Sequence, residues 1–241
     1  MNIEPANHDI PAGDVRPVNP VAALTLVLVF PRRTFERLRE RPHWFLPLLF
    51  VAGSSLVAAI YAVRGGFMDE FLREAAAATG AGMLQAEASL LWKAILMAVV
   101  AVPLMALLEA FLFKAAGALF GGRAGFRVVF GTVAYASIPA GVCALLVAAL
   151  MSITGSARVG VHLGLLVDPA LHPALWSIAR QIDLASLWFF ALLGIAAEPV
   201  FGLTRPKARL AALVFAILYI ALMSFSTGGA APDVAGPVPR L

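Results

Sequence analysis

The stretch VVFGTVAYASIPAGVCALLVAALMSI, residues 128–153, decides the fold class, because it contains no charged residue over 26 positions. About 20 consecutive apolar residues are enough for a helix to cross the ~30 Å hydrocarbon core of a bilayer. A stretch this long and this free of charge is typical of a transmembrane helix. We therefore predict that residues 128–153 cross a membrane.

The composition of the whole chain indicates the same class of protein. Of its 241 residues, 61% are hydrophobic and 13% are charged, and the mean hydropathy is +0.89. Soluble domains have about 25% charged residues, so much of this surface must face lipid. This excludes an ordinary cytosolic enzyme, and the single cysteine, Cys143, excludes a disulfide scaffold. The net charge of +4 is interpreted as an excess of basic residues in the loops that stay in the cytoplasm.

Four further apolar stretches predict an all-α fold, a polytopic transmembrane helical bundle with five spans. The predicted spans are residues 44–63, 90–113, 128–153, 184–203 and 210–225. The second apolar stretch continues to residue 120, so it is either one long tilted helix or a span followed by a surface segment. Residues 64–88 carry apolar side chains at helical spacing and predict an amphipathic surface helix.

The segment before the first span is predicted to lie in the membrane interface. The predicted organisation is a flexible cytoplasmic tail at residues 1–19, a membrane domain at 20–226 and a flexible tail at 227–241. Residues 20–41 comprise an apolar piece too short to span, a break at Pro31 and a basic helix whose Phe35 and Leu38 are expected to face lipid. Acidic residues before the apolar piece, and arginines in place of a cleavage site after it, exclude a signal peptide.

The distribution of lysine and arginine predicts the orientation. With five spans, twelve of the eighteen basic residues fall on one side, six of them in the N-terminal region. The other side receives the remaining six, which are Arg64, Arg73, Lys93, Arg158, Arg180 and Arg240. Because the basic side of a membrane protein stays in the cytoplasm, we predict a cytoplasmic N-terminus and a C-terminus on the opposite side.

Four short motifs occur in a characteristic order along the chain. They are PRRTFE at residues 31–36, GGRAGFR at 121–127, AYASIP at 134–139 and DLASLW at 183–188, the last followed by LGI at 193–195 and a basic turn. Together they resemble the Yip1 family of five-span membrane proteins, in its bacterial branch, over residues 20–226. The resemblance implies a five-helix domain with a cytoplasmic N-terminus in the bacterial cytoplasmic (inner) membrane. In eukaryotic relatives it implies binding of small GTPases and a role in vesicle trafficking, but it brings no catalytic residues to this chain.

Two glutamates stand within predicted spans, where an ionised side chain is costly. Glu109 and Glu198 both lie toward the cytoplasmic ends of their spans, and Lys114 follows Glu109 by five residues. Either the two carboxylates line a crevice that binds protons or cations, or each lies near enough to the interface for its side chain to reach water or forms a structural pair with Lys114 or Arg127. The first interpretation, translocation of protons or cations, is the alternative function that we consider.

Three prolines are expected to kink the predicted spans. Pro103, Pro139 and Pro199 lie in the second, third and fourth spans. Each removes one backbone hydrogen bond, so each helix should bend or break near its proline. Kinked helices could leave an internal crevice, although proline is also common in ordinary transmembrane helices.

The remaining candidate site is a belt of basic residues on the predicted cytoplasmic side. It comprises Arg32, Arg33, Arg37, Arg39, Arg41, Arg123, Arg127, Arg205, Lys207 and Arg209. Such a belt is suited to bind anionic lipid or partner proteins, which include other membrane proteins or a second copy, or it only fixes the topology. The leading hypothesis is a non-enzymatic membrane scaffold or partner- and lipid-interaction protein.

Other chemistries have weak signals or none. His162, Asp168 and His172 match no tight metal-binding spacing, so we predict loop residues and no metal or cofactor. The sequence has no His-Glu-x-x-His motif and no glycine-rich phosphate loop, and we predict no catalytic residues. The arginines at residues 32–41 are not interleaved with aromatic residues that would stack on bases, so nucleic acid is not an expected partner.

Overall fold

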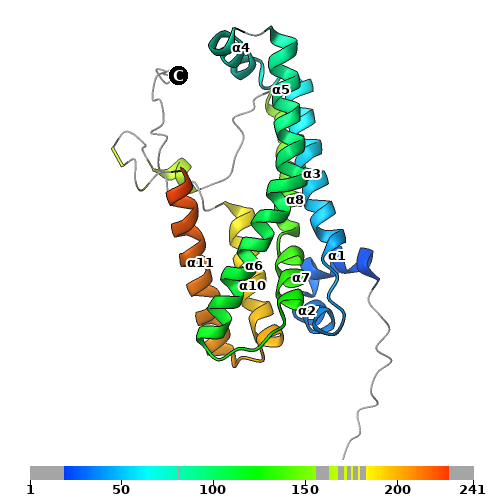
Figure 1. Cartoon of the computed structure of the whole chain (residues 1–241), viewed down its shortest axis with the longest axis vertical. Helices are drawn as coiled ribbons and strands as arrows, with labels where there is room; N and C mark the ends of the chain where they lie inside the picture. Colours follow the sequence, from blue (N-terminus) through cyan, green and yellow to red (C-terminus); the bar gives the residue numbers. More distant parts are fainter. Residues whose placement is uncertain are drawn as a thin grey trace, which may run out of the picture.

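The computed structural model (Figure 1) describes residues 19–227 except 81, 156–162, 168–170, 173–174, 176–178 and 180–182. The described residues form helices and no β-strand. Within this described part of the chain, five helical segments are long and apolar enough to cross a membrane: Phe45–Arg64, Met83–Leu119, Phe126–Thr154, Leu184–Phe201 and Arg205–Met223. The prediction of an all-α bundle with five spans is confirmed.

Some of the five segments are built from more than one helix. In chain order the helices are α1 (Pro20–Val29), α2 (Pro31–Glu40), α3 (Phe45–Arg64), α4 (Asp69–Thr79), α5 (Met83–Leu96), a π-helical turn (Met97–Ala101), α6 (Val102–Leu119), α7 (Phe126–Ala136), α8 (Ile138–Thr154), a 3-10 turn (Leu163–Leu166), α10 (Leu184–Phe201) and α11 (Arg205–Thr227).

The second span is one continuous rod that runs the height of the bundle (Figure 1). It joins α5, the π turn and α6 over 37 residues, about 55 Å at 1.5 Å per residue. Of the two forms left open by the sequence, it is therefore the single long helix. Pro103 is the second residue of α6, just after the π turn. Proline cannot donate to the residue four positions earlier, which explains why the helix departs from regular α-helical bonding here.

The third span is broken at Ser137, between α7 and α8. Pro139 is the second residue of α8, a position where its missing N–H is not needed. The Ser137 hydroxyl and backbone N–H both donate to the Val133 carbonyl, each at 2.9 Å, and complete the last turn of α7. By contrast, α10 continues through Pro199 to Phe201.

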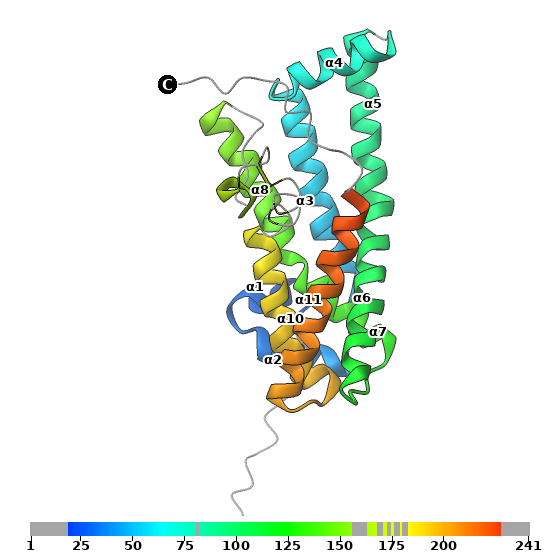
Figure 2. The same ribbon diagram turned by 90° about the vertical axis from the view of Figure 1, so that its left-hand side faces the viewer.

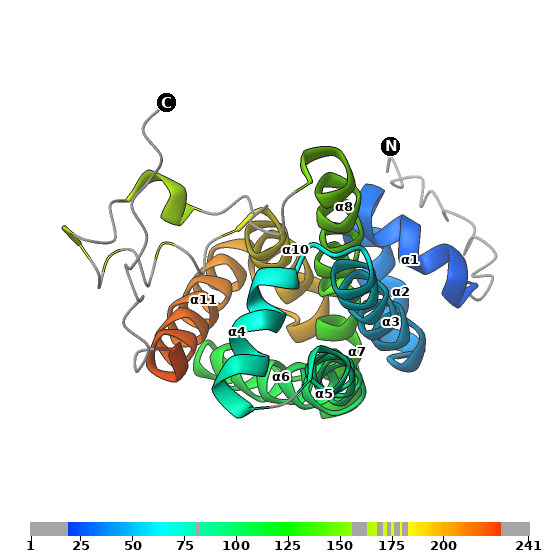
Figure 3. The same cartoon turned by 90° about the horizontal axis from the view of Figure 1, so that it is seen from above.

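The bundle is staggered, and its two ends differ. Figure 1 shows α10 and α11 beside the lower half of the rod, while α3, α5 and α8 extend above them and α4 lies across the top. Figures 1 and 2 show α1 and α2 at the lower end, where α2 packs against α7 and α10. The view from above (Figure 3) places α7 and α10 between the rod on one side and α8 on the other.

The main core lies in the lower half, where α6, α7, α10 and α11 meet. Residues 131–136 of α7 are all buried. Beside them, Phe113 of α6 packs edge to face against Phe201 of α10 at 5.0 Å and Phe215 of α11 at 5.6 Å between ring centroids. Small residues permit this approach, since a Cβ at Gly117 would lie 2.6 Å from Cζ of Phe201.

The apolar face of α2 corrects one expectation. Phe35 and Leu38, predicted to face lipid, are 0% and 5% exposed and belong to the main core. The reason is that α2 packs against α10 and α7 instead of lying apart in the interface. The amphipathic pattern was correct, but an apolar face can pack on protein as well as on lipid.

Candidate functional site

The two faces of α2 have different surroundings. Pro31 begins the helix, where its fixed φ suits the first turn. Thr34, Phe35 and Leu38 form the buried face. The other face is charged and exposed, with Arg37 and Arg39 in the last turn, where cations are favoured by the helix dipole.

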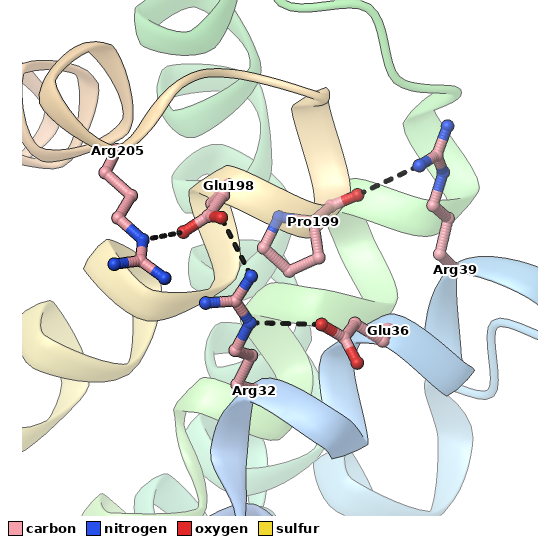
Figure 4. A network of polar contacts seen from close by, with 6 residues as sticks. All are labelled: Arg32, Glu36, Arg39, Glu198, Pro199 and Arg205. Atoms are coloured by element: carbon pink, nitrogen blue, oxygen red, sulfur yellow. Dashed lines mark hydrogen bonds and ion pairs between the residues drawn. The ribbon is translucent and has the colours of Figure 1, made fainter. Parts of the chain in front are cut away.

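Arg32 joins α2 to the end of α10 (Figure 4). Its Nη2 donates to Oε1 of Glu198 at 2.8 Å, and its Nε donates to Oε1 of Glu36 at 3.1 Å. The second oxygen of Glu198, Oε2, lies 3.5 Å from Nε of Arg205, the first residue of α11. The hydrogen bond with Glu36 and then the charge of Glu198 raise the pKa of Arg32. One carboxylate thus links three helices.

The last backbone carbonyls of α10 also accept hydrogen bonds from residues outside the helix. A helix leaves its last four carbonyls without partners of its own. Here the Pro199 carbonyl accepts from Nη1 of Arg39 at 3.3 Å (Figure 4), and the Phe201 carbonyl accepts from the Arg123 backbone N–H at 3.2 Å. The Glu198 carbonyl accepts from the Gly202 backbone N–H, and the left-handed φ of +68° at Gly202 ends the helix.

A cavity of about 550 Å³ lies beside Pro199. It is lined by α2 residues, among them Glu36 and Glu40.

The basic belt therefore divides into two groups at one end of the bundle, which we call the basic end. It is formed by α2, the α6–α7 connection and the α10–α11 connection (Figures 1 and 2). Arg32, Arg39 and Arg205 bind other helices. The second group is exposed and has no ion pair among the described residues: Arg33, Arg37, Arg41, Arg123, Arg127, Lys207 and Arg209.

The two glutamates are in different surroundings. Glu198 pairs with Arg32 and Arg205, whereas the structural pair considered from the sequence was with Lys114 or Arg127. Glu109 is half-buried on α6 and lies within electrostatic reach of Tyr219 on α11. Among the described residues, no hydrogen bond or ion pair connects Glu109 with Glu198 or with Lys114. No observation therefore favours translocation through a shared crevice.

The loop histidines are placed only in part. His162 and Asp168 lie outside the described residues, while His172 lies within them. In the part of the chain that the structure describes, no three His, Cys, Asp or Glu side chains are grouped as metal ligands.

Sequence reasoning missed the contribution of Glu36 and of the Pro199 carbonyl. Glu36 follows Arg32 by four residues, a spacing at which opposite charges meet on a helix surface, so this pair was accessible from the sequence. The Arg32–Glu198 contact joins residues 166 positions apart and has no local signal.

Comparison with known proteins gives one match. The family model described as the Yip1 domain matches residues 25–226. No curated protein and no solved structure matches the chain.

Proposed function

Because the chain belongs to the Yip1 domain family, we propose that this integral membrane protein is a non-enzymatic scaffold whose basic end binds anionic lipid headgroups and partner proteins. We place the protein in a bacterial cytoplasmic membrane with the basic end facing the cytoplasm. The excess of lysine and arginine on that side supports this orientation, since basic loops are retained there.

The proposal rests on the different roles of the two faces of α2. Its apolar face and Arg32 attach it to the bundle, so its outer arginines are presented on a fixed support. Arg33, Arg37 and Arg41 are exposed and have no ion pair within the described residues. Exposed guanidinium groups at a membrane surface are suited to phosphate and carboxylate groups, which arginine binds in a bidentate manner.

Neutralising two of these arginines is expected to weaken binding of phosphatidylglycerol by about 25-fold. Each basic residue near an anionic surface contributes about fivefold to the affinity. The measurement is fluorescence anisotropy of headgroup-labelled phosphatidylglycerol titrated with the full-length Arg33→Gln/Arg37→Gln protein in detergent micelles.

The matched control carries the same charge change at the opposite end of the bundle. Arg73→Gln/Lys93→Gln removes two exposed cations from α4 and α5 and is expected to change the affinity by less than twofold. If both double variants bind the lipid equally well, the α2 arginines have no special role and the proposal is wrong.

A further inference from the structure

A second feature of the basic end is a cavity of about 440 Å³ between the end of α6, the α6–α7 connection and the end of α10. Two cations, Lys114 and Arg123, lie on its wall, together with Ala118 and Phe201. The volume is within the range of about 300–1,000 Å³ of sites for small ligands. None of the described residues that line it is acidic.

Both cations lack an anionic partner in the described part of the chain. Lys114 is half-buried, and its ammonium lies 5.9 Å from the centre of the Phe126 ring. The Arg123 backbone N–H is bonded to Phe201, but its guanidinium is exposed and has no ion pair among the described residues. Arg32, Arg64 and Arg205 each pair with a glutamate. Two uncompensated cations on one cavity repel each other, and an anion between them would remove that cost.

The remaining wall is made of backbone that a ligand can approach. Gly122 and Gly125 line the cavity and expose main chain instead of side chains. A Cβ at Gly122 would lie 2.7 Å from Cβ of Phe201, so the connection is packed directly on α10 and the wall is fixed. Gly125, the last of these lining glycines, directly precedes α7, and its carbonyl accepts from the Val128 and Val129 N–H groups at 3.0 and 3.2 Å.

We propose that this cavity binds the phosphate group of an anionic phospholipid between Lys114 and Arg123. Lys114 lies five residues before the end of α6, about 7.5 Å into the bundle along the helix axis. Its apolar stem can run along the helix toward the surface while the ammonium meets a headgroup. A lipid is favoured over a soluble ester because Ala118 and Phe201 give the cavity an apolar side, next to Leu119, which is 72% exposed.

The inference rests on the proposed function, since it needs this end of the bundle at an anionic membrane surface. It deepens that function by naming a lipid site on residues outside α2. The same phosphatidylglycerol titration tests both, because the two sets of variants share no residue.

Lys114→Gln/Arg123→Gln is expected to weaken phosphatidylglycerol binding by about 25-fold, or about fivefold for each cation. The matched control, Arg73→Gln/Lys93→Gln, removes two exposed cations from α4 and α5 at the opposite end of the bundle and should change the affinity for phosphatidylglycerol by less than twofold. A double variant that binds like the parent, while Arg33→Gln/Arg37→Gln binds weakly, overturns this inference and leaves the proposed function standing. The reverse pattern overturns the role of the α2 arginines in the proposed function and leaves the lipid site, at the same end of the bundle, standing.

A second pair of variants guards against a folding defect. A Cβ at Gly125 meets nothing within 4 Å, and the backbone there has φ −65° and ψ 142°, which any residue can adopt. Gly125→Glu and Gly125→Gln should therefore both fold and differ only in charge. Gly125→Glu is expected to bind phosphatidylglycerol at least fivefold more weakly than Gly125→Gln. Equal affinity of the two variants for this lipid overturns the inference.

A soluble competitor identifies the source of the phosphate. Glycerol 3-phosphate has the phosphate group but no acyl chains. We expect it to displace the labelled lipid only at a concentration at least 100-fold above that of unlabelled phosphatidylglycerol. Displacement at equal concentration would mean that the cavity recognises a free phosphate ester, which overturns the assignment to a lipid.

Discussion

Phe113→Ala is expected to lower the free energy of unfolding by about 3–5 kcal/mol. Phe113 is 0% exposed and contacts the rings of both Phe201 and Phe215, so its removal leaves a cavity where three helices meet. The surrounding rings are held by their own helices and cannot fully close that space. Two residues away on α6, Phe111 is 56% exposed, which makes Phe111→Ala a matched control.

Thermal unfolding in detergent micelles measures the difference between these two variants. At about 2–4 °C for each kcal/mol, Phe113→Ala should lower the midpoint by roughly 6–20 °C. Phe111→Ala should lower it by less than about 4 °C, because that ring leaves a lipid-like environment instead of a packed core. Equal shifts would show that α6 does not present Phe113 to α10 and α11.

Phe35→Ala is expected to release α2 from the bundle. The ring of Phe35 is 0% exposed, and losing it costs about 3–5 kcal/mol. Because α2 is a short terminal element, most of this cost falls on a local opening, not on the whole bundle. The population of the opened form should rise by at least about two orders of magnitude, since each 1.4 kcal/mol is a factor of about ten.

Limited trypsin digestion of the purified protein follows this opening, since trypsin cleaves after Arg33, Arg37 and Arg39. When cleavage is slow relative to closing, its rate tracks the opened population, so we expect cleavage to be at least about 100-fold faster in Phe35→Ala. Phe30→Ala is the control, because Phe30 is 52% exposed. Similar rates for both variants would favour the original expectation that Phe35 faces lipid.

The sequence predicts the spans well, because lipid imposes a requirement that composition alone reveals. A helix such as α10, with few charges over its 18 residues, has no other stable environment. The break near Pro139 is also predictable from the sequence, because the N–H that proline lacks would bond within one turn of the same helix. The π turn before Pro103 was not predicted, because the sequence does not say how a helix will accommodate a proline.

The contacts of the candidate site are less predictable for two physical reasons. In a membrane protein an apolar face can meet lipid or protein, so the pattern around Phe35 could not say which it meets. Charge pairing between distant helices depends on how they pack, and Glu198 meets Arg32 only because α2 lies beside α10. The orientation of the bundle stays a prediction from the distribution of lysine and arginine.

The central claim is that α2 is held against the end of α10 on the cytoplasmic side and presents its outer arginines there. Cysteines at positions 32 and 198, in a Cys143→Ser background, test it with a short membrane-impermeant bismaleimide added to inverted membrane vesicles. The core contacts of Phe35 and Leu38 should keep α2 in place when the Arg32–Glu198 pair is removed.

A cysteine at position 37 paired with one at position 198 is the control, because position 37 lies about 140° around the helix from position 32. We predict a cross-link between 32 and 198 and none between 37 and 198. Labelling of both single cysteines without a cross-link at 32–198 would contradict the account.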